Sequence, residues 1–245
     1  MNWFYDLSIG RKLYYGFGAI LLLSLIIAYF GYTNTQKLNT LLDTFSNVEV
    51  PSLEALGDIK AHQNAVITGE RGLINRRMMS SELRQAQYNY YEKNMNEAEN
   101  ALSILTSLPK SNEINAEFQS FLQNWREWKS KSNIVVQLNR EKDRILSTGV
   151  SIDDPQISDI DSRAFDASLD ARQSFLSCQG NLDKLNEISV NEANNLKVKA
   201  ESESSAAITS LIFITLLALF LGLIVSRLIS NYFKSNLTSA KDMMG

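Results

Sequence analysis

The chain has 245 residues and a formal charge of −3, from 24 lysines and arginines against 27 aspartates and glutamates. Its three prolines and eleven glycines are too few for the many turns of a sandwich or barrel. One cysteine, Cys178, and one histidine, His62, exclude an internal disulfide framework, a cysteine-based zinc or iron–sulfur site and a multi-histidine metal site. The near-neutral charge gives no reason to expect nucleic-acid binding. The composition favours an all-α protein, for which we predict no cofactor.

Two long uncharged segments lie near the two ends of the chain. Residues 13–36 contain 24 consecutive residues without a charge, and residues 204–226 contain 23 more. A helix needs about 20 apolar residues to cross the hydrocarbon core of a bilayer. We therefore predict transmembrane helices over residues 13–33 and 206–226.

A competing interpretation of the first segment is a cleaved signal peptide. Arg11 and Lys12 fit the basic region of such a peptide, but the apolar stretch exceeds the usual length of about 7–15 residues. The stretch ends in YFGY (residues 29–32), without small side chains at the spacing of a cleavage site. The segment is therefore predicted to remain as a membrane anchor.

Basic residues beside the two apolar segments predict the orientation of the chain. Two precede the first segment and three follow the second: Arg11, Lys12, Arg227, Lys234 and Lys241. Since basic residues in short flanking segments stay on the cytoplasmic side, residues 1–12 and 227–245 are predicted to be cytoplasmic. Residues 34–205 are then predicted to form a domain outside the cytoplasm.

Helix-breaking residues divide this domain into four helical stretches. Pro109 lies in a turn, Pro155 follows two aspartates that can cap a helix, and Gly149 is a natural helix stop. The break near Ser80 is weaker and depends on a serine cap. Apolar residues recur at helical spacing between these breaks, which predicts an up-down-up-down four-helix bundle. The predicted helices span residues 34–78, 80–107, 111–148 and 155–205.

A further proline, Pro51, lies inside the first of these helices. Proline lacks the N–H group of the helical hydrogen bond, and its ring crowds the preceding turn. We therefore expect the helix to bend at this residue or to lose a backbone hydrogen bond.

The sequence contains no arrangement of residues that is typical of catalysis. It has no glycine-rich phosphate loop, no nucleophile elbow and no HExxH motif, so the chain is not predicted to be an enzyme. His62 lies on a polar helix face, where we expect exposure or a hydrogen bond. Cys178 lies on an apolar face and is predicted to be buried. Trp125 and Trp128 are predicted to pack in the core rather than to form an aromatic ligand box.

Several local sequences resemble those of bacterial methyl-accepting chemotaxis receptors whose sensor is a four-helix bundle. LSIGRKLYYGFG (residues 7–18) resembles that family's lead-in to its first membrane span. VPSLEAL (residues 50–56) followed by VITGERGL (residues 66–73) resembles its first sensor helix. IVSRLIS (residues 224–230) resembles the exit from its second span into a HAMP signalling helix.

The segment after the second span departs from this family pattern. The proline that is often found early in a HAMP helix is missing from SNYFK (residues 230–234). The chain also stops at Gly245, before a complete HAMP domain, methylation helices or a kinase-contacting hairpin. We expect residues 227–245 to be the start of a HAMP-like signalling helix in a truncated chain.

The resemblance implies a receptor in the cytoplasmic (inner) membrane, with its sensor domain in the periplasm or outside the cell. Such a receptor is a homodimer that binds a small molecule or a ligand-loaded binding protein and shifts its fourth sensor helix relative to the first. It acts on cytoplasmic signalling partners through a region beyond this chain. The alternatives are the sensor of a membrane histidine kinase or cyclase, and a membrane-anchored adaptor without a sensory role.

The resemblance also implies a ligand site in the membrane-distal half, between the first and fourth sensor helices. Arginine at such a site favours a carboxylate ligand, which it binds through paired hydrogen bonds. The alternative is a solvated or dimer-facing surface, and Gln63 and Glu70 are rival pocket residues nearer the core. The predicted ligand-binding residues, four on one face of the first helix and two on the fourth, are Asn64, Thr68, Arg71, Asn75, Arg172 and Gln173.

Overall fold

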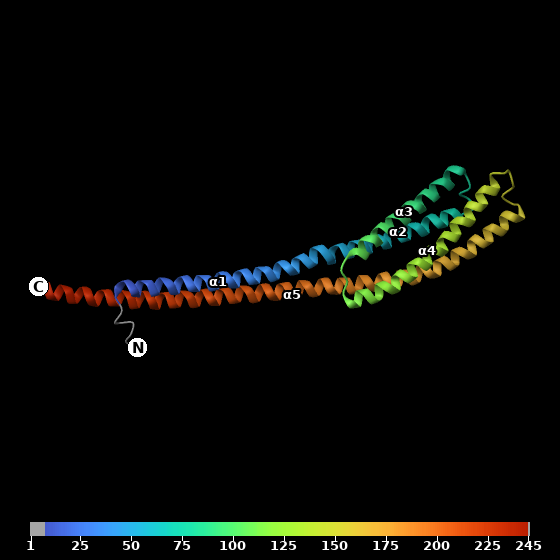
Figure 1. Ribbon diagram of the computed structural model, residues 1–245. Helices are drawn as coiled ribbons and strands as arrows, with labels where there is room; N and C mark the ends of the chain where they lie inside the picture. Colours follow the sequence, from blue (N-terminus) through green and yellow to red (C-terminus); the bar gives the residue numbers. More distant parts are fainter. Residues whose placement is uncertain (1–7, 245) are drawn as a thin grey trace. The chain divides into compact units, whose positions relative to one another are not determined.

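The computed structural model describes residues 8–244 as long helices joined by short connections (Figure 1). Residues 1–7, which are most of the predicted N-terminal cytoplasmic segment, and Gly245 lie outside the described residues. Within residues 8–244 there is no strand, and the predicted all-α class is confirmed. The elements are α1 (Ile9–Thr44), the π-helical turn η1 (Phe45–Glu49), α2 (Val50–Ile74), α3 (Ser81–Ser107), α4 (Asn112–Leu146) and α5 (Pro155–Met244).

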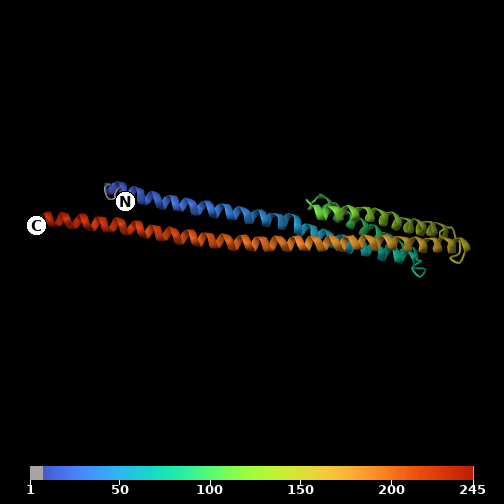
Figure 2. The ribbon, with the colours of Figure 1, turned by 90° about the horizontal axis from the view of Figure 1, so that it is seen from below.

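The chain divides into two compact units, of which the first consists of Met1–Asp43 and Leu196–Gly245. In its described part, α1 and the C-terminal half of α5 lie side by side (Figures 1 and 2). The two helices approach closely at Gly16, where an added Cβ atom would lie 3.1 Å from Val225 Cγ1. The missing side chain therefore permits this close contact between the helices.

Both helices of the first unit are long and apolar enough to cross a membrane. Many of their large apolar side chains are mostly exposed, including those of Phe17, Leu25, Phe213 and Leu223. Water disfavours so continuous an apolar surface, and soluble proteins rarely present one. A lipid bilayer stabilises such a surface, because a helix satisfies all of its backbone polar groups internally.

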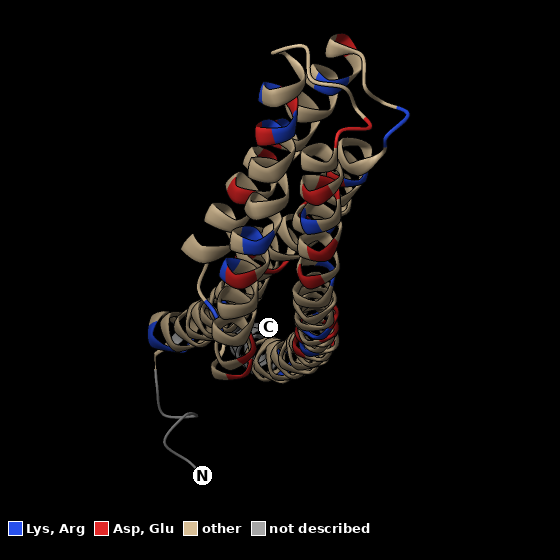
Figure 3. Ribbon diagram, turned by 90° about the vertical axis from the view of Figure 1, so that its right-hand side faces the viewer, with Lys and Arg blue, Asp and Glu red and all other residues tan. Residues whose placement is uncertain are grey.

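The second unit, Thr44–Asn195, contains η1, α2, α3, α4 and residues 155–195 of α5. Lysines and arginines are interspersed with aspartates and glutamates along these helices (Figure 3). The apolar side chains gather in the interior instead, as the helical spacing of the apolar residues predicts. The unit is a four-helix bundle.

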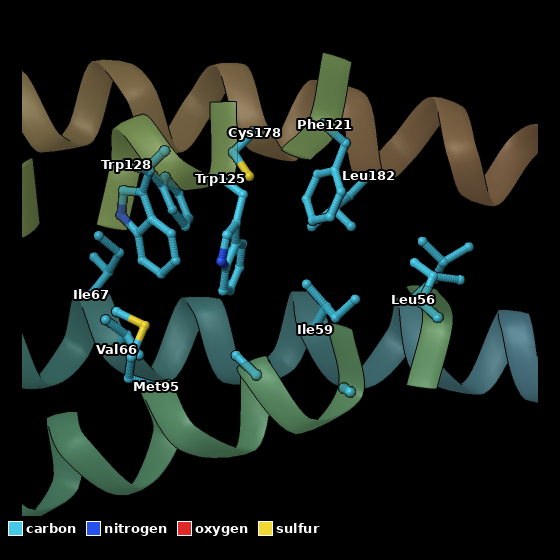
Figure 4. Packing of buried hydrophobic residues seen from close by; sticks show 14 of the residues in the cluster. Leu56, Ile59, Val66, Ile67, Met95, Phe121, Trp125, Trp128, Cys178 and Leu182 are labelled. Atoms are coloured by element: carbon cyan, nitrogen blue, oxygen red, sulfur yellow. The ribbon is translucent and has the colours of Figure 1, made fainter. Parts of the chain in front are cut away.

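Aromatic and aliphatic side chains fill the core of this bundle (Figure 4). The ring centroids of Phe121 and Trp125 on α4 are 5.9 Å apart, and those of Trp125 and Trp128 are 5.0 Å apart. Cys178 of α5 and Val66 of α2 belong to the same cluster. Both tryptophans and the cysteine are buried, which confirms the predicted packing role of these three residues.

Local capping interactions set the ends of the helices in the bundle. Ser80 Oγ accepts a hydrogen bond from Leu83 N–H (3.3 Å), and Ser111 Oγ accepts one from Ile114 N–H (3.2 Å). The first outer helix ends at Ile74, earlier than residue 78, because the backbone of Asn75 is extended (ψ 111°). Sequence reasoning extended this helix because the serine cap was the only break it recognised there.

The distortion expected at Pro51 occurs as a π-helical turn, η1, just before the proline. The N–H of Val50 donates to the carbonyl of Phe45, five residues back instead of four. The extra residue in this turn changes the helical phase. As a result Phe45 is 37% exposed although it is apolar, whereas Glu49 is only 5% exposed although it is charged.

Candidate ligand-binding groove

A groove of about 230 Å³ lies between α2 and α5 in the bundle. Ile67, Arg71 and Ile74 line it from α2, where they follow one another at positions i, i+4 and i+7. Helical geometry places residues at this spacing on one face. Phe165, Leu169 and Arg172 line it from α5 at the same spacing. Each helix thus presents one arginine and at least two apolar side chains to the groove, and Glu70 on α2 and Ser168 and Phe175 on α5 complete the lining.

The groove brings together two of the predicted ligand-binding residues, Arg71 and Arg172, which are 101 positions apart in the sequence. Both side chains belong to exposed residues. Within the part of the chain that the structure describes, neither guanidinium forms an ion pair with a carboxylate. Two such cations beside apolar walls suit an anion that carries an apolar group.

Glu70, one of the two rival pocket residues, lies at the inner side of the groove and is 3% exposed. Its Oε2 atom accepts a hydrogen bond from Ser132 Oγ (2.7 Å), and Ser132 Oγ also lies 3.0 Å from Tyr91 Oη. Burial raises the pKa of Glu70 to about 7, although the Ser132 hydrogen bond and the charge of Arg71 lower it. The groove therefore adjoins a carboxyl group that titrates near neutral pH.

The raised pKa of Glu70 is expected to make the stability of the bundle depend on pH. Unfolding returns this pKa to its ordinary value of 4.5, so between pH 4.5 and about 7 the folded state binds more protons than the unfolded state. The free energy of unfolding should therefore fall as pH rises through this range, by on the order of 3 kcal/mol, and level off above it. Urea unfolding followed by circular dichroism at several pH values measures this slope.

Glu70→Gln should remove most of this slope, because glutamine keeps an acceptor for Ser132 but does not titrate. Glu97→Gln, on an exposed position of α3, should leave the slope as it is in the unmodified chain. An equal slope in the unmodified chain and in Glu70→Gln would contradict the assignment of the titration to Glu70.

The other predicted residues of α2 lie outside the lining of the groove. Asn64 is exposed, its Nδ2 group donates to the Lys60 carbonyl (2.7 Å), and its Oδ1 accepts from Gln179 Nε2 (3.2 Å). Thr68 Oγ1 donates to the carbonyl of Asn64 (3.0 Å). These contacts hold the two side chains against the helix surface beside the groove.

Asn75 and Gln173 are also separate from the groove lining. Asn75 ends α2, and its Oδ1 accepts a hydrogen bond from Arg77 N–H (3.0 Å). Gln173 is an exposed residue of α5 that follows Arg172 in the chain. Gln63, the second rival residue, is fully buried within the bundle and does not line the groove. A role in ligand binding remains a prediction for all of these residues.

Sequence reasoning did not single out Phe165 and Leu169 as groove residues. These apolar side chains on α5 are 52% and 51% exposed, because they lie outside the phase of the buried Ala164 and Ala171. A signal was available in the sequence, since the two residues are four apart and Arg172 follows at the next turn of the same face.

Residues 6–204, which are 199 of the 245 residues, match the family described as the four helix bundle sensory module for signal transduction. The chain belongs to this family, the sensory modules of methyl-accepting chemotaxis proteins. The resemblance seen in the sequence is thereby confirmed. No curated protein and no solved structure matches the chain.

The family of this sensory module is one of signal transduction and not of enzymes. In the region described by the structure, no group of three or more His, Cys, Asp and Glu side chains could hold a metal ion. The ring Nδ1 of His62, the single histidine of the sensory module, lies 2.8 Å from Asn94 Oδ1. His62 was expected to be exposed or to form a hydrogen bond, and this contact confirms the hydrogen bond.

Proposed function

We propose that the chain is the sensor region of a membrane chemotaxis receptor and binds a small carboxylate in the groove between α2 and α5. The observation that carries this proposal is the pair Arg71 and Arg172, which line one groove from two helices and form no ion pair within the described residues. A guanidinium binds a carboxylate through two parallel hydrogen bonds. The apolar side chains of the groove, such as Phe165 and Leu169, suit an aryl or alkyl group on the same ligand.

The proposed signal is a small displacement of α5 relative to α2. Arg172 and the apolar residues 206–226 belong to the same uninterrupted helix, Pro155–Met244, which supports such a mechanism. Helix shifts of about 1–2 Å are a known form of switching. A coupling free energy of about 1–3 kcal/mol between ligand and signalling state is enough for a useful response.

We further propose the topology and assembly in which this receptor works. The basic residues that flank the two apolar segments support cytoplasmic termini and a sensor domain in the periplasm or outside the cell. The receptor is proposed to be a homodimer in the inner membrane, with the bundle of residues 34–205 between the spans 13–33 and 206–226. Residues 227–245 are proposed to begin a HAMP-like helix that acts on cytoplasmic signalling partners.

Binding of aryl carboxylates tests the ligand proposal. The full chain in lipid nanodiscs would be titrated with benzoate, phenylacetate and succinate by isothermal calorimetry. We expect at least one of these carboxylates to bind, and the corresponding amide, which lacks the charge, to bind at least about tenfold more weakly. Arg71→Ala and Arg172→Ala should each weaken binding of the carboxylate by about 10–100-fold.

Arg163→Ala is the matched control for these two variants. Arg163 is an exposed arginine of α5 that contacts Asp159 one turn away and does not line the groove. This variant should bind the carboxylate as the unmodified chain does. Binding that survives both Arg71→Ala and Arg172→Ala would discard the groove as the site. A folded chain that binds none of the three probes would favour recognition of a protein partner.

A further inference from the structure

A second cavity, of about 370 Å³, lies elsewhere in the bundle and shares no lining residue with the groove. Its walls come from the end of α1, from η1 and the start of α2, from the end of α3, the start of α4 and the connection between them, and from α5. Glu49 of this cavity and Arg71 of the groove are 22 residues apart along one helical run, which corresponds to about 33 Å. The volume lies within the range of small-molecule sites, about 300–1,000 Å³.

The side chain of Glu49 makes this cavity acidic. Glu49 is 95% buried, since only 5% of its surface is exposed, and it lines the cavity. Within the described part of the chain, its carboxylate forms no hydrogen bond and no ion pair. Burial and the nearby charge of Glu192, which lines the same cavity from α5, raise the pKa of Glu49.

Lys110 is the one basic residue among the described residues that line the cavity, and its ammonium group is already occupied. Its Nζ atom donates to the carbonyls of Leu105 (2.6 Å), Thr106 (3.1 Å) and Leu108 (2.8 Å) at the end of α3. An ammonium group has three protons, so these carbonyls use all of them. Lys110 also lies 4.6 Å from the ring centroid of Phe118 and forms no ion pair with Glu49 or Glu192.

The rest of the lining is mostly apolar. Its polar residues are four with hydroxyl groups, of which Ser52 and Ser189 are buried, and the other two are Thr44 and Ser111. Ca²⁺ or Mg²⁺ would need about six oxygen ligands, most of them charged or strongly polar, and among the described residues no group of three or more His, Cys, Asp and Glu side chains could hold a metal ion. An ammonium ion on an apolar body needs only one carboxylate and a few acceptors, and it places its apolar part against the walls. The apolar walls are formed by Val48, Leu56, Leu105, Ile114, Phe118 and Leu185.

We propose that this cavity is a second ligand site of the sensory module, which binds an organic ammonium ion with an apolar body. Glu49 is the residue that pairs with the ammonium group, and Glu192 adds to the negative potential around it. The π-helical turn η1 matters here because it turns the side chain of Glu49 inwards. The site is independent of carboxylate binding in the groove.

Isothermal calorimetry on the full chain in lipid nanodiscs tests this site with benzylammonium, 2-phenylethylammonium and cyclohexylammonium. Each amine is compared with its neutral alcohol of the same shape, such as 2-phenylethanol for 2-phenylethylammonium. We expect at least one amine to bind and its alcohol to bind at least tenfold more weakly. Equal binding of amine and alcohol, or no binding of any amine to the folded chain, would overturn the proposal.

Glu49→Gln should weaken binding of the amine at least tenfold, because it removes the charge and keeps the volume. The matched control is Glu54→Gln, an exposed position of α2 that does not line the cavity. Thermal unfolding of both variants establishes that they are folded. Glu49→Gln is expected to fold, because it keeps the volume of the side chain and breaks no hydrogen bond or ion pair of the described residues. Unchanged amine binding by a folded Glu49→Gln variant would overturn the assignment.

Proton release provides a second readout that a purely structural role of Glu49 would not produce. An ammonium ion beside the carboxylate favours its ionised form, so binding near the raised pKa should expel part of a proton. The other charged groups that face this carboxylate are Glu192 on α5 and Lys110 before α4. Titrations at several pH values above 4.5, the ordinary pKa of a glutamate, in two buffers of different ionisation enthalpy should give different heats. This difference should vanish in Glu49→Gln and persist in Glu54→Gln.

Discussion

Trp128→Ala is expected to lower the free energy of unfolding of the bundle by about 3–5 kcal/mol. The Trp128 side chain is fully buried, and its ring centroid lies 5.0 Å from that of Trp125 and 6.2 Å from that of Phe175. Truncation removes a large apolar area from the core and leaves a cavity between α4 and α5. A core at crystal-like packing density collapses only partly into such a cavity. Urea unfolding of the full chain, followed by circular dichroism, measures the loss.

Ile134→Ala is the control for this variant, since Ile134 lies on the same helix but is 46% exposed. The free energy of unfolding of this control should fall by about 1 kcal/mol or less, as is usual for surface substitutions. Trp128→Phe should fall between the two, because it keeps an aromatic ring in the core. Losses of equal size in Trp128→Ala and Ile134→Ala would contradict the placement of Trp128 at the centre of the core.

Arg84→Ala is also expected to lower the free energy of unfolding by about 3–5 kcal/mol, in this case because it removes a buried charge from its partners. The buried guanidinium of Arg84 joins α2, α3 and α4. Its Nε donates to Asp143 Oδ2 (3.0 Å), its Nη2 to Asn139 Oδ1 (3.1 Å), and its Nη1 to the carbonyl of Leu73. The truncation would leave a half-buried carboxylate, a buried amide and a helix-terminal carbonyl without this donor. Groups left unpaired in this way carry their full cost of desolvation.

Arg140→Ala is a close control for Arg84→Ala. The Arg140 guanidinium lies 4.5 Å from the ring centroid of Tyr88, whereas that of Arg84 lies 5.6 Å from it. Arg140 pairs with Glu92, but about half of each side chain is exposed, so its removal should cost about 1 kcal/mol or less. The double variant Arg84→Ala with Asp143→Ala should lose less than the sum of the two single losses. Additive losses would indicate that the two side chains do not interact.

The fold class and the family of this chain follow from signals that are local in the sequence. Pro109 and Pro155 separate helical stretches because proline and the caps beside it act within a few residues. The uncharged segments 13–36 and 204–226 are recognisable from their length alone. The burial of Trp125 and Cys178 follows from their place in a helical apolar stripe, since helix phase is also a local property.

The candidate sites could be predicted only in part from such local signals. The sequence predicts Arg71 on one face of the first sensor helix and Arg172 on the fourth, but their common groove depends on how α2 and α5 pack. Two helices of known phase can still be rotated about their axes or shifted along them. Rotation and shift are set by how side chains of the two helices interdigitate, for which the sequence provides no local signal. The same packing places Phe165 and Leu169 beside Arg172 in this groove.

The formation of the acidic cavity depends almost entirely on tertiary structure. Pro51 predicts a distortion of the first outer helix, but the sequence is compatible with either a bend or a lost backbone hydrogen bond. The structure forms the π-helical turn η1, which changes the phase of the helix and brings Glu49 inside the bundle. Sequence therefore determined where helices form and which residues prefer the interior. Tertiary packing determined which charged groups share a cavity, because their partners come from segments that are distant in the chain.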